Sequence, residues 1–145
     1  MIRELQQGDK EIFLEMCKKF YTSPAVLHTI PLSYMEETFR QVTSGSPYAN
    51  GYLLTHEGVP AGYLLTSTTY SNEVGGLVLW LEELYLDEAF RGHGLGGEAM
   101  EYARKNCPPG VKRLRLEVAE GNKAIHLYER KGYEKLDYIQ MVQDF

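Results

Sequence analysis

The sequence is poor in cysteine, with only Cys17 and Cys107 among its 145 residues. The two do not form a CxxC pair, and neither has a histidine nearby at the spacing of a metal ligand. Structural zinc sites are built from cysteine and histidine at short, regular spacings, so we expect no metal in this protein. Each cysteine is instead expected to be a buried, unreactive thiol.

An excess of basic residues is also missing. The chain has 20 Asp and Glu against 15 Lys and Arg, which gives a formal net charge of −5. Domains that bind nucleic acids usually concentrate positive charge on one face, so we expect no nucleic-acid partner.

Long apolar runs are absent as well. The first residues, MIRELQQGDK, lack the hydrophobic region of a signal peptide. No segment approaches the roughly 20 apolar residues that a membrane-spanning helix needs. We therefore expect a cytoplasmic protein without a membrane partner.

What the sequence does have is the composition of one globular domain. Hydrophobic residues make up 43% of the chain and charged residues 24%, which is typical of a folded protein. A chain of 145 residues can bury one sizeable core but is short for two. We expect a single domain over residues 1–145.

Hydrophobic periodicity and capping residues predict the order of the elements. A first helix is expected from Gly8 to about Phe20. Ser33 is expected to cap a second helix, with Glu36 as its capping-box partner. Gly132 is expected to end the last helix. The predicted elements are strand 2–5, helices 8–20 and 33–42, strands 52–56, 61–70 and 77–86, a helix that begins near residue 95, strand 113–118, helix 122–131 and strand 133–142.

The three central strands are joined by short turns at residues 57–58 and 71–76, which predicts an antiparallel meander. The whole order, β-α-α-β-β-β-α-β-α-β, predicts an α/β (α+β) fold. Its sheet is expected to be mixed, mostly antiparallel and twisted, with flanking helices.

The segment RGHGLGG, residues 91–97, places four glycines where a helix is expected to begin. Glycine costs about 1 kcal/mol relative to alanine inside a helix, so the missing side chains must serve another purpose. Unpaired N–H groups and the positive end of the helix dipole make such a position an anion site.

Three phosphate-containing ligands can be compared with this segment. A Walker loop requires Gly-Lys-Ser/Thr, which does not follow. Gly92, Gly94 and Gly97 spell GxGxxG, but a dinucleotide loop directly follows the first strand of a parallel βαβ unit, whereas here residues 87–91 and a meander come first. The diphosphate of coenzyme A suits the pattern RxxGxG at residues 91–96, a few residues past an antiparallel strand.

Two segments of the sequence resemble the GNAT superfamily of acetyltransferases, and the resemblance extends from about residue 50 to 135. The first is LEELYLDEAFRGHGLGGEAM and the second is GNKAIHLYERKGYEK. The second contains the residues that match the family run A-x-x-L-Y-x-x-x-G-[FY], namely Ala124, Leu127, Tyr128, Gly132 and Tyr133.

Two parts of the chain depart from the family pattern. The family usually has an asparagine three residues before the matched alanine, where this chain has Gly121 and places Asn122 one residue later. Residues 1–49 match the family only in outline, as one strand and two helices.

The resemblance implies a GNAT-like fold and acetyl transfer from acetyl-CoA, as cosubstrate, to a primary amine of a small molecule or peptide, by direct attack in a ternary complex. Backbone groups at the end of the third meander strand would pair with the pantetheine arm like an added strand, and one amide would donate to the oxyanion. The implied coenzyme-binding residues are Tyr85, Leu86, Arg91, Gly92, His93, Gly94, Leu95, Gly96, Gly97 and Asn122.

Three of these residues also have a structural interpretation. Arg91 can either add charge or cap the loop, His93 can either contact a phosphate or lie exposed, and Asn122 can either contact the coenzyme or act as a helix N-cap. The family also often forms dimers, so a homodimer through the final strand is a further possibility that the resemblance implies.

Glu82 and Glu83 are the candidates for the general base, because an amine with a pKa near 10 must lose a proton before it attacks. They lie in the apolar segment WLEELYL, and strand alternation predicts that they point to opposite faces, with one in the active-site cleft. The sequence alone does not decide between them. The resemblance favours Glu82, since related polyamine-type acetyltransferases have a carboxylate there.

Tyr128 is the candidate for the acid, because it matches the family tyrosine whose hydroxyl approaches the coenzyme sulfur. The alternative interpretations are that the two glutamates are ordinary surface carboxylates and that Tyr128 is a packed aromatic residue.

Acidic and aromatic residues of the first half would suit a small cationic amine as the acceptor. Glu36 and Glu37 could add negative charge, although acidic residues are also common in the solvated first turn of a helix. Candidate aromatic walls are Tyr21, His28, Tyr34 and Phe39. The alternative function is a non-catalytic sensor or regulator that binds acyl-CoA through the same fold; Tyr128 and the glutamate pair favour an enzyme.

Overall fold

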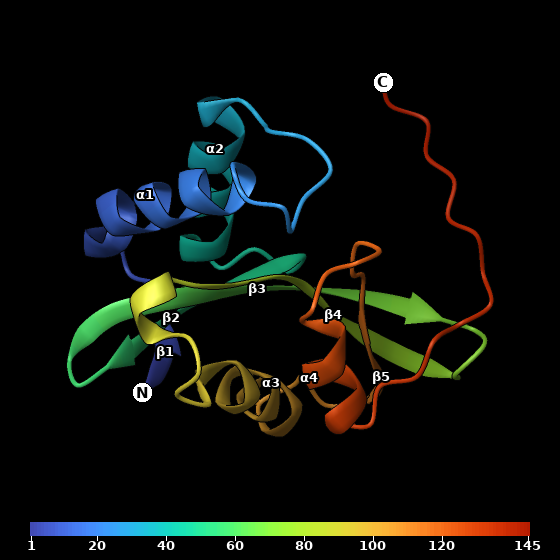
Figure 1. The fold of residues 1–145 in the computed structure, drawn as a ribbon. Coiled ribbons are helices and arrows are strands. Elements are labelled where there is room, and N and C mark those ends of the chain that lie inside the picture. The colour runs from blue at the N-terminus through green and yellow to red at the C-terminus, as the bar shows by residue number, and fades with distance from the viewer.

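One mixed sheet of five strands, in the order β1-β2-β3-β4-β5, runs through the middle of the computed structural model, which describes residues 1–145 (Figure 1). The strands are β1 (Ile2–Glu4), β2 (Ala49–His56), β3 (Val59–Ser71), β4 (Gly76–Leu86) and β5 (Val111–Leu116). The helices are α1 (Lys10–Tyr21), α2 (Leu32–Thr43), α3 (Leu95–Lys105) and α4 (Ile125–Arg130), with short 3₁₀ turns η1 (Gln7–Asp9) and η2 (Glu88–Phe90).

Strands β1 to β4 pair antiparallel, and β5 is added parallel to β4. The turn between β2 and β3 is Glu57–Gly58, with φ values of 49° and 80°, as a tight hairpin turn requires. The fold class, the meander and the mixed sheet predicted from the sequence are therefore confirmed.

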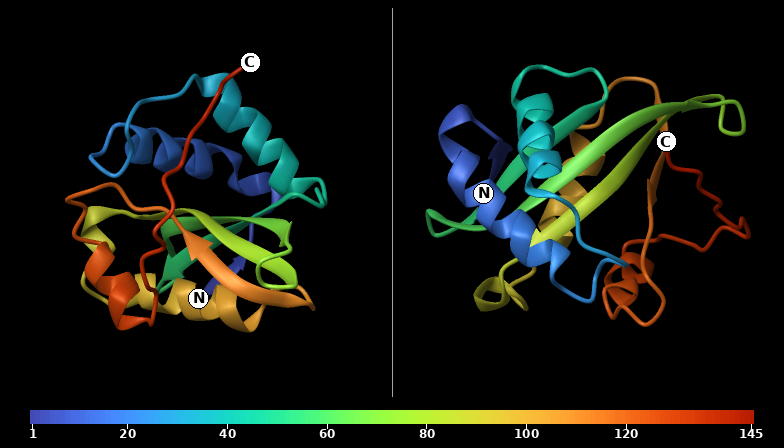
Figure 2. Two further views of the ribbon diagram at one scale, coloured as in Figure 1. Left: turned by 90° about the vertical axis from the view of Figure 1, so that its right-hand side faces the viewer. Right: turned by 90° about the horizontal axis from the view of Figure 1, so that it is seen from above.

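Helices cover both faces of the sheet, with α1 and α2 on one face and α3 and α4 on the other (Figures 1 and 2). The α1–α2 layer buries an aromatic-rich core that includes Phe13, Phe39 and Tyr63. The α3 layer buries an aliphatic core that includes Leu64 and Ala99. Each large apolar side chain removed from water stabilises the fold by about 1.5–3 kcal/mol, so the two layers hold the sheet rigidly between them.

The predicted capping box of α2 does not form. The helix begins at Leu32 with Pro31 in the N-cap position, where φ is −62° and ψ is 149°. Proline is pre-set to this φ, and it lacks the N–H that a helix start leaves unpaired. Ser33 consequently lies inside the first turn, and the Glu36 carboxylate lies 3.7 Å from the Lys10 ammonium instead.

The prediction of a final strand over residues 133–142 is wrong. After α4 the chain has no regular structure, and its large side chains are exposed, including Ile139 at 92% and Met141 at 91%. The alternation of apolar and polar residues fails at Tyr138–Ile139 and again at Met141–Val142, so no single face of a strand would be apolar. The outer edge of β5 has no strand partner within the chain.

Cys17 is buried in α1, as expected, and burial raises the pKa of its thiol to about 12. Cys107 is only half-buried, and its Sγ lies 3.3 Å from the Arg104 carbonyl oxygen. No helix of the structure is both long and apolar enough to cross a membrane.

Candidate active site

The sheet opens where β4 and β5 separate. The two strands pair from Leu77–Val111 to Leu81–Leu116, and no pairing continues beyond that point. Strand β4 runs on to Leu86 with β3 as its partner on one edge and no strand on the other. The end of β4 therefore offers a free edge to which an extended group can be added.

Backbone direction decides which groups face this free edge. The Asp87 N–H donates to the Ala61 carbonyl of β3 at 2.9 Å. Because successive residues of an antiparallel strand point their backbone groups to opposite edges, those of Tyr85 also face β3. The N–H groups of Leu84 and Leu86 face the free edge, and the Leu86 carbonyl there accepts Arg91 Nε at 3.1 Å.

Glu82 and Glu83 lie on the same face of the sheet, not on opposite faces as strand alternation predicts. Leu65 pairs with Glu83 and Thr66 pairs with Leu81, so Glu82 is one extra residue in β4. Such a β-bulge resets the alternation. Both carboxylates consequently point toward the α1–α2 layer.

The Glu83 carboxylate is held by two tyrosines. Tyr63 OH donates to Oε2 at 2.8 Å, and Tyr21 OH donates to Oε1. Burial raises the pKa of Glu83 above its ordinary value; the two tyrosine hydrogen bonds act in the opposite direction, and the nearby Glu82 charge adds to the rise. A half-buried carboxylate with a raised pKa is suited to accept a proton near neutral pH.

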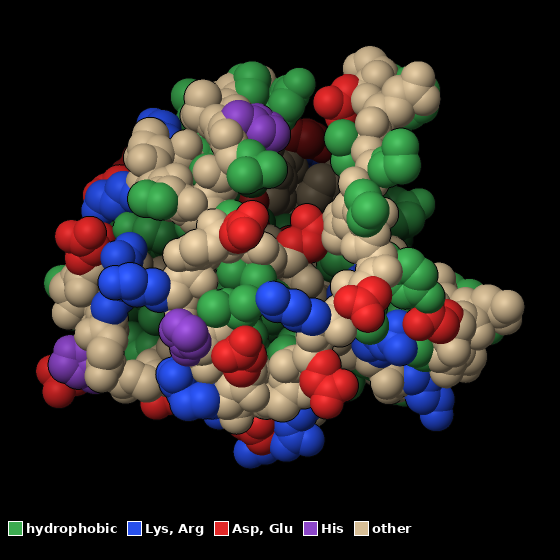
Figure 3. All heavy atoms as spheres, turned by 45° about the vertical axis from the view of Figure 1, so that its right-hand side comes forward, with side chains coloured by type: hydrophobic (Ala, Val, Ile, Leu, Met, Phe, Trp, Pro, Cys, Tyr) green, Lys and Arg blue, Asp and Glu red, His purple; other side chains and the backbone are tan.

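Glu82 has a different environment. Its side chain is exposed, and its Oε1 accepts a hydrogen bond from Ser67 Oγ, which lies across the bulge on β3. One side of the molecule is hollowed between the helical layer and the C-terminal segment, with acidic side chains beside the hollow (Figure 3). Glu82 is therefore accessible to a charged ligand from solvent, whereas Glu83 lies deeper.

The four glycines of residues 91–97 have two different structural purposes. Gly92 and Gly94 both have a φ of 81°, and Gly94 occupies the N-cap position of α3. Side chains are strained in this left-handed conformation, and a Cβ at either position would meet no neighbouring atom within 4 Å. Backbone conformation thus requires these two glycines, and the space over the loop remains open.

Gly96 and Gly97 instead allow α4 to pack closely against the start of α3. A Cβ on Gly96 would lie 3.1 Å from Leu127 Cδ2, and a Cβ on Gly97 would lie 3.2 Å from Lys131 Cε. The same Cβ would lie 3.5 Å from Lys131 Nζ, which places an ammonium group beside the first turn of α3. Leu95, the first residue of α3, is buried.

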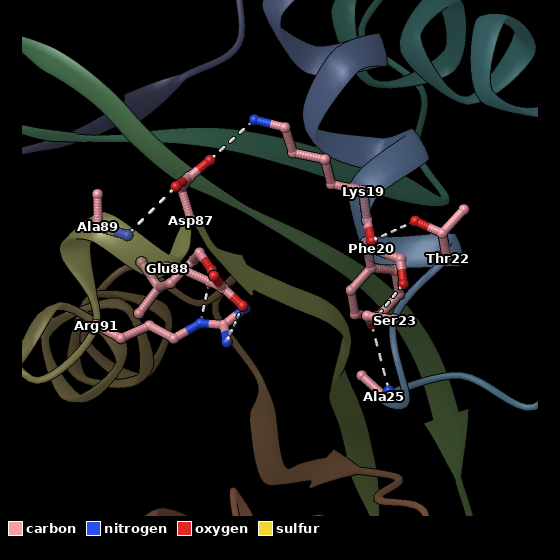
Figure 4. Close-up of polar contacts among 10 residues, drawn as sticks. Lys19, Phe20, Thr22, Ser23, Ala25, Asp87, Glu88, Ala89 and Arg91 are labelled. Atoms are coloured by element: carbon pink, nitrogen blue, oxygen red, sulfur yellow. Dashed lines mark hydrogen bonds and ion pairs between the residues drawn. The ribbon is translucent and has the colours of Figure 1, made fainter.

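Arg91 and His93 have structural contacts within the loop region. Arg91 caps the end of β4 through the Leu86 carbonyl, and its Nη1 lies 3.7 Å from Glu88 Oε1 (Figure 4). The His93 ring is exposed and lies 5.3 Å, between centroids, from the ring of His56. Their contact with a coenzyme stays a prediction.

Tyr128 and Asn122 come from the segment that leads into and forms α4. Tyr128 is half-buried, burial raises the pKa of its hydroxyl, and its ring lies 6.3 Å from that of Tyr133. Asn122 Oδ1 accepts the Ala124 N–H at 3.0 Å, so it caps the turn that precedes α4. The helix itself begins at Ile125, three residues later than predicted.

Two acidic residues of α2 lie outside this site. Glu36 is near Lys10, and Glu37 pairs with Arg40 on the exposed side of the helix. Both side chains are exposed, but they lie beyond the first turn of α2, the turn in which they are expected from the sequence. The structure contains no cluster of three His, Cys, Asp or Glu side chains that could hold a metal ion.

Sequence reasoning misses the residues that contact Glu82, Glu83 and the loop. Tyr63 was hidden in an apolar strand, and Ser67 carried no motif. Tyr21 was expected only as an aromatic wall. Lys131 lies in the matched family segment, but only the packing of α4 on α3 shows that it reaches Gly97.

The family model described as "Acetyltransferase (GNAT) family" matches residues 12–133. A search of curated protein sequences finds no match.

Solved structures share the fold at low sequence identity. A possible acetyltransferase from Clostridium difficile 630 has a TM-score of 0.85 at 16% identity, covering 100% of this chain and 97% of its own. The enzyme AAC(6')-Iy, in complex with a bisubstrate analogue, has a TM-score of 0.82 at 14% identity, with coverages of 100% and 97%. Glucosamine-6-phosphate N-acetyltransferase from Arabidopsis thaliana has a TM-score of 0.73 at 23% identity, again covering 100% and 97%.

The raised pKa of Glu83 predicts that Glu83→Gln stabilises the protein at neutral pH. The Glu83 carboxyl binds a proton more readily in the folded protein than in the unfolded chain. The free energy of unfolding of wild type should therefore fall as the pH rises from about 4.5, the ordinary pKa of a glutamate, through the raised pKa of Glu83. Each unit of elevation corresponds to about 1.4 kcal/mol. Glutamine does not titrate, so the melting temperature of Glu83→Gln minus that of wild type should increase from pH 4 to 7.5.

The matched control is Glu57→Gln, which removes an exposed carboxylate from the turn between β2 and β3, away from Glu83. Its melting temperature should follow that of wild type across the pH range. A constant difference between Glu83→Gln and wild type would show that Glu83 does not titrate abnormally in the folded protein.

Proposed function

Since the chain belongs to the acetyltransferase (GNAT) family, we propose that it moves an acetyl group from acetyl-CoA to a primary amine of a small molecule or peptide, by direct attack within a ternary complex. The observation that carries the proposal is Glu83, a tyrosine-held carboxylate at the point where β4 separates from β5. At this point a candidate base, Glu83, lies by the free edge of β4, next to the open loop of residues 91–97.

The loop and the strand edge fit a coenzyme A moiety. Residues 91–97 leave open space above Gly92 and Gly94 at the start of α3, where a diphosphate would meet unpaired N–H groups. The structural neighbour AAC(6')-Iy has been solved with CoA. Bound acetyl-CoA would supply the activated acetyl group.

Strand β4 would hold the pantetheine arm through its free edge. The N–H groups of Leu84 and Leu86 face that edge, so they are the donors available to the arm and to the thioester oxygen. This differs from the expected pair of Tyr85 and Leu86, because Tyr85 presents its side chain to the α1–α2 core and its backbone to β3.

Glu83 would act as the general base and Glu82 would hold the acceptor. An amine is protonated at neutral pH and must lose a proton to attack, and the raised pKa of Glu83 suits that transfer. Glu82 is exposed beside it on the same face, where its charge would attract a cationic acceptor. This assignment makes Glu83, the deeper carboxylate, the general base, whereas the family resemblance favoured Glu82 for that role.

Tyr128 would act as the acid for the leaving thiolate. Its hydroxyl is half-buried, and its raised pKa keeps it protonated at neutral pH. A sensor that binds acyl-CoA without turnover would need neither Tyr128 nor the glutamate pair, so turnover distinguishes the two functions. The cytoplasmic location stays a prediction.

Coenzyme binding is tested with a matched pair of glycine variants. Gly94→Ala and Gly45→Ala each place a side chain at a φ near 80°, and each should lower the free energy of unfolding by about 1–2 kcal/mol. Only Gly94→Ala should also weaken acetyl-CoA binding, measured by isothermal titration calorimetry, because Gly45 lies in a distant loop.

In wild type, acetyl-CoA at 100 times its dissociation constant should stabilise the fold by about 2.7 kcal/mol, and NAD should not. Equal affinities of the two alanine variants, or a melting shift with NAD, would contradict the assignment of the loop.

Catalysis is tested with Tyr128→Phe. The variant should bind acetyl-CoA as wild type does but release thiol about 100-fold more slowly, since general acid catalysis contributes at least that much. Thiol release is followed with a panel of diamines, aminosugars and peptides.

Tyr133→Phe is the control, because that neighbouring hydroxyl is buried without a hydrogen-bond partner and has no proposed role. Thiol release at the wild-type rate by Tyr128→Phe would remove it from the mechanism, and a wild type that binds acetyl-CoA without turning over any amine would favour the sensor.

We also propose a homodimer in which residues 134–145 of one chain pair with β5 of another. The segment exposes Ile139, Met141 and Val142, and β5 has a free outer edge. A free edge and an apolar strand segment together favour strand addition between chains.

Light scattering should therefore give twice the 16.6 kDa chain mass for wild type and the single mass for an Ile139→Lys/Met141→Lys double variant. Val59→Lys, which changes an exposed apolar residue elsewhere, should remain dimeric. A monomeric wild type would overturn the proposal.

A further inference from the structure

Tyr21 lies where the candidate base meets the irregular loop that follows α1. It is the last residue of α1, and its hydroxyl donates to Glu83 Oε1. Residues 22–31 then cross to α2 without regular structure. Tyr21 thus links an acidic group of β4 to the irregular segment between α1 and α2.

The two tyrosines on Glu83 are not equivalent. Tyr63 is fully buried, with its ring 5.2 Å from Phe13 and 5.7 Å from Tyr85 between centroids. Tyr21 is half-buried, and its ring packs edge-on against Phe20 at 5.2 Å. Tyr63 is therefore a fixed part of the core, whereas the position of Tyr21 depends on the last turn of α1.

The last turn of α1 is held to β4 at a second point and is tightly connected to the loop (Figure 4). Lys19 Nζ lies 3.0 Å from Asp87 Oδ2, one residue past the end of β4. On the loop side, Ser23 Oγ donates to the Phe20 carbonyl at 2.6 Å and accepts the Ala25 N–H at 3.3 Å. An acceptor that contacts residues 22–31 would therefore lie beside the helical turn that carries Tyr21.

We propose that Tyr21 is a positioning residue, whose hydroxyl orients Glu83 toward the acceptor and keeps its carboxylate ionised. The inference rests on the proposed role of Glu83 as the base. Tyr21 would not touch the reacting atoms; it would act through Glu83. The titratable groups that face Glu83 are Tyr21 and Cys17 from α1, Tyr63 from β3 and Glu82 beside it on β4.

The first test needs no acceptor. The Glu83 carboxyl carbon is titrated by ¹³C NMR in wild type, Tyr21→Phe and Tyr34→Phe, and its signal is assigned by its absence in Glu83→Gln. A hydrogen bond to a carboxylate lowers its pKa, so removing the Tyr21 hydroxyl should raise the pKa of Glu83 by about one unit. Tyr34 is exposed on α2 without a side-chain hydrogen bond to Glu83, so its variant should titrate like wild type.

The second test uses acetyl-CoA and whichever amine of the panel gives the fastest thiol release. In Tyr21→Phe the acid limb of kcat/KM should move to higher pH by the same amount as the NMR titration. An unmoved Glu83 pKa in Tyr21→Phe, or an equal shift in Tyr34→Phe, would overturn this inference alone. Wild-type turnover by Glu83→Gln would instead overturn the assignment of Glu83 as the base.

Discussion

The β-bulge at Glu82 gives β4 one residue more than β3 over the same length of the ladder. Without the extra residue, the two glutamates would lie on opposite faces, one against the α3 layer and one toward α1. With it, Leu81 and Leu84 both pack toward α3, while both carboxylates point to the opposite face of the sheet. The bulge lies next to the last β4–β5 pair at Leu81–Leu116, so the free strand edge and the carboxylates occur together.

The sequence predicts the architecture well because most of its elements have strong local signals. Period-2 and period-3.6 patterns place the meander, α1 and α3, and Glu57–Gly58 predicts the hairpin turn. The prediction of a final strand is wrong: the apolar residues at 136–142 suggest a strand, but the alternation of apolar and polar residues is broken, and within the chain the segment does not pair with the free edge of β5. Local apolar content indicates that a segment is suited to a strand, but it does not show that the segment pairs with an available edge.

The candidate site is less predictable than the fold because its geometry depends on contacts between distant segments. The motif residues 91–97 and Tyr128 are found from sequence, as is the pair of glutamates. The bulge leaves no trace in the sequence, so the orientation of Glu82 and Glu83 is predicted incorrectly. The supporting tyrosines come from α1 and β3, 62 and 20 residues away from Glu83, and only the packed core brings them together.

The buried position of Tyr63 also separates the part of the protein that holds Glu83 from the exposed loop of residues 22–31. Tyr63 belongs to the aromatic core, so a substitution that removed its contact with Glu83 would also reduce the stability of the fold. Residues 22–31 contribute no strand or helix, and Leu27 there is 90% exposed. Substitutions in this loop can therefore accumulate at little cost in folding free energy. Exposed positions of the loop such as Leu27 can therefore change without disturbing the contact between Tyr63 and Glu83.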